Sequence, residues 1–414
     1  MSGSIDRRGF LHRTGAAALA VTAAGYTATS RGYAANETIT VACIGTGGRC
    51  RALMDRLKLM QGVRIAAVCD VWDHHLHLAR ELAGPKAAAE TDYRRLLERK
   101  DIDAVVIASP DHWHVPMTVD ACDAGKDVYV EKPLTHDLSE GKRVVEAQDR
   151  NKRIVQVGTQ QRSMPHLIEA REIVRSGTLG RVHKIRLSWN RNQARWARKK
   201  PKIDPKSVRW KQFLGSAPEQ PFDAYRFRNW RWFWDFGGGI FTDLMVHWID
   251  TAYWMLDMGN PATAASIGDH FRTRGLWETP DTVQTLLRYP EDELQAHFEG
   301  TFASHRHRAM LELMGDKAAL YVDRGRYELH PEQGSGVAAK ERIDARNPVR
   351  GADFYDDVDG ETYHLSDWLR AVRSRKKPSC PAEEGVRSAA AAHLANIALR
   401  AGKVARWEEH APRG

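Results

Sequence analysis

Asp243 and His247 are the residues whose type and spacing most directly suggest chemistry. They stand four positions apart just after three glycines at 237–239, so a helix starting there would place both side chains on one face near its N-terminal end. Oxidation of a secondary alcohol needs a group that removes the hydroxyl proton, and histidine suits this role near neutral pH. Lys132 could bind the reacting oxygen and stabilise its developing negative charge, while Asp243 orients the substrate or tunes the imidazole. A solvated helix face with a capping aspartate would give the same pattern.

A glycine-rich segment indicates a phosphate-binding turn. Gly45-Thr46-Gly47-Gly48-Arg49-Cys50 directly follows an apolar run and precedes a helical pattern. In this context Gly45 permits a tight turn, Gly47 lets a pyrophosphate approach the backbone, and the helix N-terminus supplies partial positive charge. Asp70 ends the next apolar run, where a carboxylate can accept hydrogen bonds from a ribose diol. Because no cation for a 2′-phosphate follows Asp70, the sequence predicts NAD in preference to NADP.

The elements that must position these residues show two patterns. Short apolar runs at 39–44, 63–69, 103–108 and 127–130 alternate with helical stretches, which is typical of a parallel sheet covered on both faces. After residue 157, alternating apolar and polar residues at 182–189, 283–289, 294–302 and 310–314 predict antiparallel strands with one solvated face.

The predicted fold class is therefore α/β with two domains. We expect an N-terminal Rossmann domain at 36–157 and a C-terminal α/β domain at 158–414 with an open, mainly antiparallel sheet. The polar stretch 331–361 is expected to be an irregular loop. Two closing helices, at about 362–374 and 383–401, are expected to pack back on the first domain.

Residues 1–35 are predicted to form a twin-arginine signal peptide and are excluded from the fold. Arg7-Arg8 is followed by Phe10-Leu11, an alanine-rich apolar stretch, and small residues (Ala34, Ala35) suited to cleavage. The apolar stretch is too short and too rich in alanine for a stable membrane span. Since this route moves folded proteins, the sequence predicts a periplasmic protein exported with its cofactor bound.

Composition excludes several other classes of protein. The net charge of +9 suits anionic ligands, but it is too modest to indicate nucleic-acid binding. Five cysteines without paired spacing argue against a disulfide framework. The basic stretch 191–211 contains Trp196 and Trp210, and we interpret it as a solvated loop or as a lid presenting cations to an acidic or phosphorylated sugar. The histidine-rich tract at 73–77 is expected to be a solvated helix face.

Four motifs, in this order, resemble the Gfo/Idh/MocA family of oxidoreductases, which includes glucose–fructose oxidoreductase and inositol dehydrogenases. They are Ala-Ser-Pro-Asp-His-Trp-His at 108–114, Glu-Lys-Pro at 131–133, Val-Gly-Thr-Gln-Gln-Arg at 157–162, and the glycines at 237–239 with Asp243 and His247. The resemblance covers nearly all of 38–402. It implies a sugar or cyclitol substrate and a cis bond before Pro133. The open sheet is expected to be the interface of a homo-oligomer (dimer or tetramer), and export predicts that NAD is tightly bound.

The motifs and the resemblance together assign the site. The catalytic residues are expected to be Lys132, Asp243 and His247. The expected cofactor contacts are Gly45, Gly47, Gly48, Arg49, Asp70, Ser109, Pro110, His114, Glu131, Lys132 and Gln160. The candidate substrate contacts are Arg162, Trp230 and Trp232, since indole rings stack on sugar rings; core packing explains the aromatic run at 227–234 equally well. No metal site is expected, because the position of His112 and His114 after a Rossmann strand favours cofactor or substrate contact.

Three functions stay open at this point. The first is a net dehydrogenase acting on a sugar or cyclitol hydroxyl. The second is a glycosidase that retains NAD and works through a transient keto-sugar, by oxidation, elimination, addition and reduction. The third, a sugar sensor with unused NAD, is disfavoured by the presence of Lys132 and His247. The Asp243-x-x-x-His247 pattern favours the dehydrogenase.

Overall fold

The structure is a computed structural model that describes residues 38–193, 201–346, 349–353 and 359–412. The predicted signal peptide at 1–35 lies outside these residues, as does Trp196 of the basic stretch. Within the described part of the chain, no helix is both long and apolar enough to cross a membrane. All five cysteines are buried and free.

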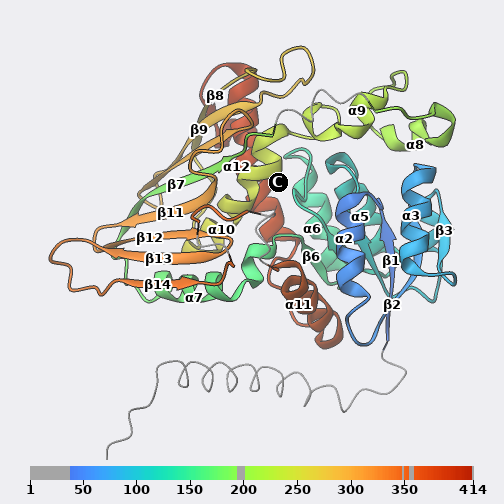
Figure 1. Ribbon diagram of the computed structural model, residues 1–414, viewed down its shortest axis with the longest axis horizontal. Helices are drawn as coiled ribbons and strands as arrows, with labels where there is room; N and C mark the ends of the chain where they lie inside the picture. The colour runs from blue at the N-terminus through green and yellow to red at the C-terminus, as the bar shows by residue number, and fades with distance from the viewer. Residues whose placement is uncertain (1–37, 194–200, 347–348, 354–358, 413–414) are drawn as a thin grey trace, which may run out of the picture. The chain divides into compact units, whose positions relative to one another are not determined.

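The first sheet has the six parallel strands expected of a Rossmann domain, in the order β3-β2-β1-β4-β5-β6. Their apolar side chains are buried because helices cover the sheet (Figure 1). The strands are β1 (Ile39–Ile44), β2 (Val63–Cys69), β3 (Ala88–Glu90), β4 (Ala104–Ile107), β5 (Asp127–Val130) and β6 (Val155–Val157). The helices are α2 (Gly48–Leu57), α3 (Asp73–Ala83), α4 (Tyr93–Leu97), α5 (His114–Asp123) and α6 (Glu140–Arg150). The predicted fold class is confirmed. Sequence analysis missed β3, because three residues of Ala-Ala-Glu carry no strand signal.

The second sheet has nine strands in the order β14-β13-β12-β11-β7-β10-β9-β8-β15. It is mainly antiparallel, as predicted, although β7 and β10 pair in parallel. Its strands are β7 (Val182–Asn190), β8 (Thr263–Asp269), β9 (Thr282–Tyr289), β10 (Leu294–Thr301), β11 (Ala309–Gly315), β12 (Ala318–Asp323), β13 (Arg326–Pro331), β14 (Lys340–Ile343) and β15 (Ala405–Arg406). Strand β14 lies in the stretch expected to be an irregular loop; it is polar because it forms the sheet edge, where no core face demands apolar residues.

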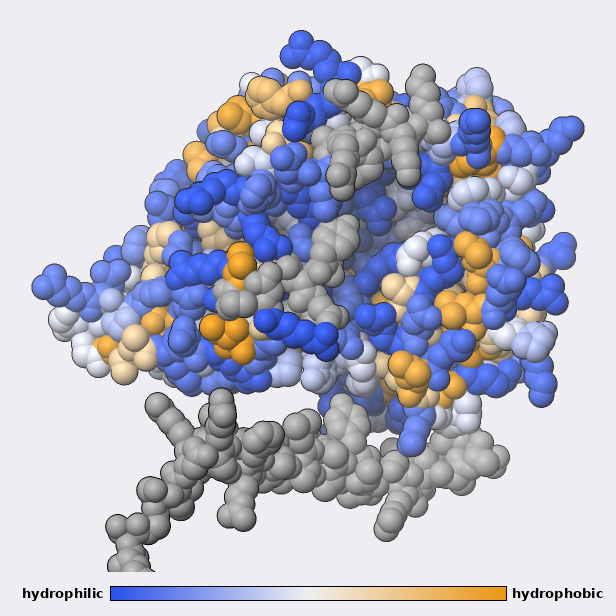
Figure 2. Space-filling model, in the orientation of Figure 1, coloured by the Kyte–Doolittle hydropathy of each residue, from blue (hydrophilic) through white to orange (hydrophobic). Residues whose placement is uncertain are grey.

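One face of the second sheet is solvated. In β9, Val283, Leu287 and Tyr289 are buried, whereas Leu286 between them is exposed. The buried face is covered by α7 (Pro165–Arg175), α10 (Val246–Leu256) and α12 (Ala382–Ala401). The side of the molecule drawn in Figure 2 is largely hydrophilic, with separate hydrophobic patches.

The last two long helices pack against the first domain, and the second of them also contacts the second sheet. Helix α11 (Glu361–Ser374) contacts α2, and α12 contacts α6 and β6 on one side and β8 and α10 on the other (Figure 1). Because α12 lies between two sheets, it is alanine-rich and apolar around most of its circumference. This packing fixes the carboxyl ends of the parallel strands against α10, where the candidate site lies.

Candidate functional site

Lys132 and Asp243 form the centre of the site. The ammonium of Lys132, which follows β5, donates to the Asp243 carboxylate at 2.9 Å and to the Asp243 backbone oxygen at 2.7 Å. Arg231 donates to the same carboxylate from 3.1 Å. Burial by itself would raise the pKa of Asp243, but the cations of Lys132 and Arg231 outweigh burial and lower it. Asp243 is therefore a carboxylate at neutral pH, and it holds Lys132 at the wall of the cleft.

His247 stands one turn beyond Asp243 on the same side of the helix. Asp243 lies in a π-helical turn at Phe241–Met245, which continues directly into α10 with His247 at its second residue. Both residues line one cleft together with Lys132. The structure thus places together the three residues predicted to be catalytic.

The tautomer of His247 follows from its neighbour. Nδ1 of His247 lies 3.2 Å from the side-chain oxygen of Gln161, and that oxygen also accepts from Arg324 at 3.4 Å. Since an amide oxygen only accepts, Nδ1 carries the proton and Nε2 is the acceptor nitrogen. Sequence analysis missed Gln161, which lies in a quoted motif but is 86 residues from His247 along the chain.

The imidazole of His247 is buried and surrounded by cations. Burial lowers its pKa well below the usual value, and the nearby charges of Lys132 and Arg324 lower it further. A neutral imidazole whose Nε2 is the acceptor nitrogen has the properties of a general base at neutral pH.

The glycine turn after β1 has the geometry that a dinucleotide requires. Gly45 has a φ of 74°, and a Cβ there would lie 2.6 Å from the backbone nitrogen of Ser109. No side chain fits at this position, because β1 and β4 approach too closely. Gly48 begins α2 and has open space around it, so the helix N-terminus is accessible to an anion.

Arg49 is held at the cleft by two carboxylates. Its guanidinium pairs with Glu131 at 2.7 Å and with Glu361 of α11 at 2.9 Å. These pairs connect the glycine turn to β5 and to the closing helix. Arg49, Glu131 and Gln160 line the cleft, as does Gly48, whereas Gly45 and Gly47 line the neighbouring cavity.

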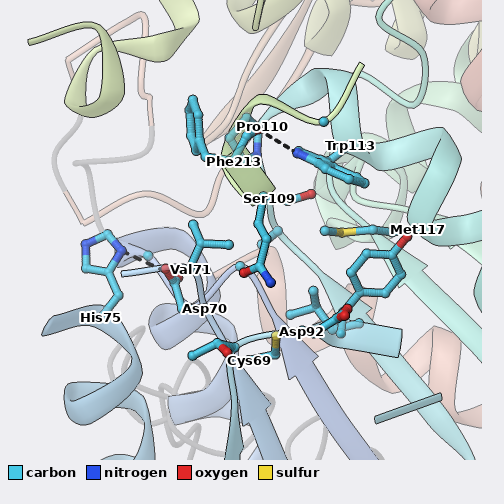
Figure 3. A pocket seen from close by; sticks show the side chains of 18 of the residues that line it. Cys69, Asp70, Val71, His75, Asp92, Ser109, Pro110, Trp113, Met117 and Phe213 are labelled. Carbon is cyan, nitrogen blue, oxygen red and sulfur yellow. Dashed lines mark hydrogen bonds and ion pairs between the residues drawn. The ribbon is translucent and has the colours of Figure 1, made fainter. Parts of the chain in front are cut away.

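Asp70 lies at the carboxyl end of β2, beside His75 (Figure 3), and it is almost completely buried. Its carboxylate accepts from the backbone of Trp72 at 2.9 Å and from Thr46 at 3.3 Å, and His75 lies 3.5 Å from it. His75 lines the cavity and covers Gly47. The prediction that the histidine-rich tract is solvated is therefore wrong for His75, because this side chain packs against the glycine turn.

Two cavities meet at the carboxyl ends of the parallel strands. One, of about 310 Å³, is lined by Asp70, Pro110, Tyr93 and Met117 and by residues of the second domain; the other is the catalytic cleft, of about 1000 Å³. Ser109 lines both. An apolar cavity with a ribose-binding carboxylate, joined through a glycine turn to a polar cleft, fits an extended dinucleotide.

His114 and His112 make structural contacts. The ring of His114 lies between the backbone oxygens of Pro133 (2.6 Å) and Ser109 (2.9 Å), next to the cis Lys132–Pro133 peptide, and burial lowers its pKa to about 4. His112 lies 2.9 Å from the backbone oxygen of Phe213, and burial lowers its pKa to about 3. Among the residues that the structure describes, no group of three or more potential ligands is arranged to hold a metal.

Arg162 is not brought to the cleft. Its guanidinium makes a bidentate pair with Asp250 of α10, at 2.8 Å to each oxygen, and also contacts Glu384 and the backbone of Ser379. The pair is almost fully buried. The prediction that Arg162 contacts the substrate is therefore wrong, because Arg162 joins α10 to α12.

An Arg162→Met substitution is expected to lower the free energy of unfolding by about 3–5 kcal/mol, since it leaves the Asp250 carboxylate buried without its cation. Urea denaturation would measure this, with Arg175→Met, an exposed arginine at the end of α7, as the matched control. Unchanged stability together with a raised KM would instead restore the substrate role.

The two tryptophans differ in their surroundings. Trp230 is partly exposed and lines both cavities, with the guanidinium of Arg231 4.2 Å from its ring centre. Trp232 also lines the cleft, but it is buried and stacks on Trp277 at 4.3 Å. Trp230 is therefore the better placed of the two to meet a ligand.

Asp111 is a cleft residue that sequence analysis did not select. It is 4% exposed and lies just after β4, on the wall that includes Lys132 and Asp243. Burial raises its pKa to about 8; the charges of Lys132 and Arg231 oppose this shift, while Asp243 and Glu140 add to it. A carboxyl group that is neutral at pH 7 therefore adjoins the catalytic pair. Only its burial, which the sequence does not reveal, distinguishes it from an ordinary surface aspartate.

Two stretches of the chain match known protein families. Residues 39–159 match the family described as "Oxidoreductase family, NAD-binding Rossmann fold", and residues 207–321 match the "GFO/IDH/MocA C-terminal domain". Together the two matches span more than half of the chain.

The curated relatives include proteins named as glycosyl hydrolases and proteins named as dehydrogenases. "Glycosyl hydrolase family 109 protein 1" of Shewanella sp. (strain ANA-3) is 29% identical over 185 residues, which are 43% of this chain and 40% of the relative. "Inositol 2-dehydrogenase" of Salmonella typhimurium is 33% identical over 122 residues, which are 29% of this chain and 36% of the relative. The matched segments thus cover well under half of either relative.

Solved structures match the whole fold. A levoglucosan dehydrogenase in complex with NADH and levoglucosan is 17% identical, with a TM-score of 0.69 over 91% of this chain and 100% of that chain. This likeness shows the fold. With the two family matches, it leads to one conclusion: the chain belongs to the Gfo/Idh/MocA family of NAD-binding oxidoreductases.

Proposed function

We propose that this protein oxidises a secondary hydroxyl of a sugar or cyclitol, using NAD as the acceptor. The observation that carries this proposal is the grouping of Lys132, Asp243 and neutral His247 on one wall of a polar cleft that adjoins the dinucleotide cavity. Polar, hydrogen-bonding walls suit a polyhydroxylated substrate, and Trp230 offers a face for a sugar ring.

Each residue of the group has a separate task. Nε2 of His247 accepts the proton of the reacting hydroxyl. The ammonium of Lys132 binds the same oxygen and stabilises the negative charge that develops on it. Asp243 fixes the position of Lys132 through their ion pair. Bound NAD would supply the hydride acceptor, held by the glycine turn at Gly45 and Gly47 and by Asp70.

The preference for NAD over NADP rests on Asp70. A carboxylate at the end of β2 accepts hydrogen bonds from the ribose diol and repels a 2′-phosphate. Asp70→Ala is expected to weaken NAD binding by about 1–3 kcal/mol, the usual cost of leaving hydrogen-bonding groups unpaired. It should also reduce the difference between the affinities for NAD and NADP. Calorimetric titration would measure both, with Asp55→Ala on the exposed side of α2 as the control. Tighter binding of NADP than NAD by the native protein would contradict the assignment.

The state of Asp111 predicts a pH dependence. Below about pH 8 this carboxyl is neutral; above it, a negative charge stands beside the oxygen on which alcohol oxidation builds negative charge. Turnover should therefore fall as the pH rises through about 8, and Asp111→Asn, neutral at every pH, should remove that fall. Profiles of kcat against pH for the two proteins, with Asp55→Asn as control, would measure it. The same alkaline fall in Asp111→Asn would show that another group causes it.

A glycosidase that retains NAD is the second candidate. It is favoured by the relatives that are named as glycosyl hydrolases. Their matched segments of 185 residues are longer than the 122 residues matched by the inositol 2-dehydrogenase. The same groups could serve it: oxidation at one carbon acidifies a neighbouring C–H, and elimination then expels the glycosidic group. The ketone would be reduced at the end, so no net oxidation occurs.

One pair of assays separates the two candidates. A dehydrogenase should accumulate reduced nicotinamide when a free sugar or cyclitol and NAD are supplied. A glycosidase that retains NAD should cleave aryl glycosides without added NAD and should introduce solvent deuterium beside the transient ketone. If neither substrate class is turned over, the proposed function fails.

Three further properties belong to the proposal. Export by the twin-arginine route to the periplasm, with tightly held NAD, rests on Arg7-Arg8, and loss of export in a variant with both changed to Lys would test it.

A homo-oligomer is supported by Ile267 and Leu286, which are 66% and 61% exposed on the open face of the second sheet. Light scattering would measure its mass, and a monomer would contradict this part.

A further inference from the structure

Residues 205–232, here named the strap, reach from the second domain over the carboxyl ends of β2 and β4. The strap contains the short helices α8 (Trp210–Leu214) and α9 (Ala224–Arg228). Arg209 donates its backbone N–H to Val71 at 2.8 Å, and its side chain pairs with Asp73 at 2.6 Å. Farther along, the backbone oxygen of Phe213 accepts from the indole of Trp113 at 2.8 Å. The strap is therefore attached at both walls of the smaller cavity.

The strap forms the outer wall of this cavity. Lys211, Phe213 and Phe227 line it together with Asp70 and Ser109 of the first domain, and Figure 3 draws Phe213 among these lining residues. The approach is close at Gly215, whose φ is 56° and where a Cβ would lie 2.4 Å from the ring of Trp113. Side chains of both domains thus enclose the space that would hold the adenosine half of the cofactor.

Arg228, the last residue of α9, lies where the two cavities join. It lines both of them, as do Ser109 and Trp230. A dinucleotide that reaches from the ribose carboxylate of Asp70 into the catalytic cleft must place its pyrophosphate at this junction. Arg228 therefore faces the part of the ligand that carries the negative charge.

The charges around Arg228 leave it without an acidic partner in the described part of the chain. Its guanidinium lies 5.6 Å from the ring centre of Trp72, and the salt bridges of the described residues do not include it. Partial burial lowers the pKa of Arg228, and the positive charge of Arg51 lowers it further. Arg51 donates to the backbone oxygen of Thr46 in the glycine turn, at 2.7 Å. An arginine that lines both cavities, beside the glycine turn and the N-terminus of α2, is placed to bind a doubly charged anion.

We propose that Arg228 binds the cofactor pyrophosphate from the side opposite to the N-terminus of α2, so that the strap holds the dinucleotide in place between turnovers. The inference rests on the proposed function only in that NAD is the ligand. Because the contact comes from the second domain, the cofactor cannot leave without loss of this contact or displacement of the strap. Retention of this kind suits an enzyme that uses one bound NAD repeatedly.

The test measures release of the cofactor and needs no sugar. The holoprotein is loaded with NADH and mixed with excess NAD, and nicotinamide fluorescence follows the dissociation. Arg228→Gln should release NADH about 10- to 100-fold faster, the effect of losing a charge-assisted hydrogen bond, and Arg228→Lys should lie between it and the native protein. Lys206→Gln, an exposed cation on the same strap, is the matched control and should leave the rate unchanged. Equal release rates in Arg228→Gln and the native protein would overturn the proposal.

Binding of fragments identifies the part of the ligand that Arg228 recognises. In calorimetric titrations, Arg228→Gln should weaken the binding of ADP-ribose, which contains the pyrophosphate, by a similar factor. The binding of adenosine should be unchanged. Equal weakening of adenosine would mean that the variant disturbs the strap, and it would reject a specific pyrophosphate contact. If Arg228 controls NADH release but no sugar is turned over, the pyrophosphate contact stands and the proposed function fails. If a sugar is turned over but Arg228→Gln leaves NADH release unchanged, the proposed function stands and the pyrophosphate contact is rejected.

Discussion

Lys132→Met is expected to lower turnover by about 10²–10⁴-fold while NAD binding persists. Methionine keeps the length and apolar stem of the side chain but removes the cation that stabilises the developing oxyanion. Asp243 would still have Arg231 at 3.1 Å, so the buried carboxylate keeps a partner and the fold should survive. The glycine turn and Asp70 are unchanged, which is why cofactor affinity should persist.

Steady-state kinetics with the substrate class that the native protein turns over would measure this loss. Lys142→Met, the same substitution at an exposed position of α6, is the matched control and should keep full activity. A turnover close to the native value in Lys132→Met, with intact folding, would remove Lys132 from the mechanism.

His247→Gln is expected to cause a loss of similar size, about 10²–10⁴-fold, because it removes the group proposed to accept the proton of the reacting hydroxyl. In the native protein, burial and the cations around His247 keep its pKa well below the usual value, so the base is neutral throughout the physiological range. Activity should therefore not fall with decreasing pH through the range in which an ordinary histidine titrates. His297→Gln, on strand β10 and outside the cleft, is the control for the same substitution.

Gln161→Leu examines how His247 is oriented. Without the amide oxygen, Nδ1 loses the acceptor that fixes the tautomer, and part of the population would present an N–H to the substrate. Turnover should fall less than in His247→Gln, with KM nearly unchanged. If His247→Gln and Gln161→Leu both show the kinetics of the native protein, proton transfer through His247 is excluded under either proposed function.

The first half of the site could be predicted from the sequence because its signals are local. A tight turn between a strand and a helix requires glycine, so the function of Gly45 is evident from its neighbours along the chain. The same holds for Asp70, which directly ends an apolar strand, and for the helix that brings Asp243 and His247 one turn apart. Periodicity likewise predicted both sheets, since burial of a face imposes a repeat on the residues of each strand.

Only the tertiary structure determined which distant residues meet. Lys132 and Asp243 are 111 residues apart, and their contact depends on α12 holding the two sheets together. Arg162 belongs to a motif that follows a Rossmann strand, yet it turns away from the cleft because Asp250, 88 residues later, offers a buried bidentate partner.

The remaining properties depend on burial. A side chain's neighbours along the chain do not report how much water surrounds it, so the raised pKa of Asp111 and the lowered pKa of His247 could not be predicted. Nor could the position of Arg228, because the smaller cavity is lined by segments of the two domains that are far apart in the sequence. The sequence determines each local element and its chemistry, whereas the charge states and partners of the site are set by long-range packing, which excludes water and brings remote charges within a few ångströms.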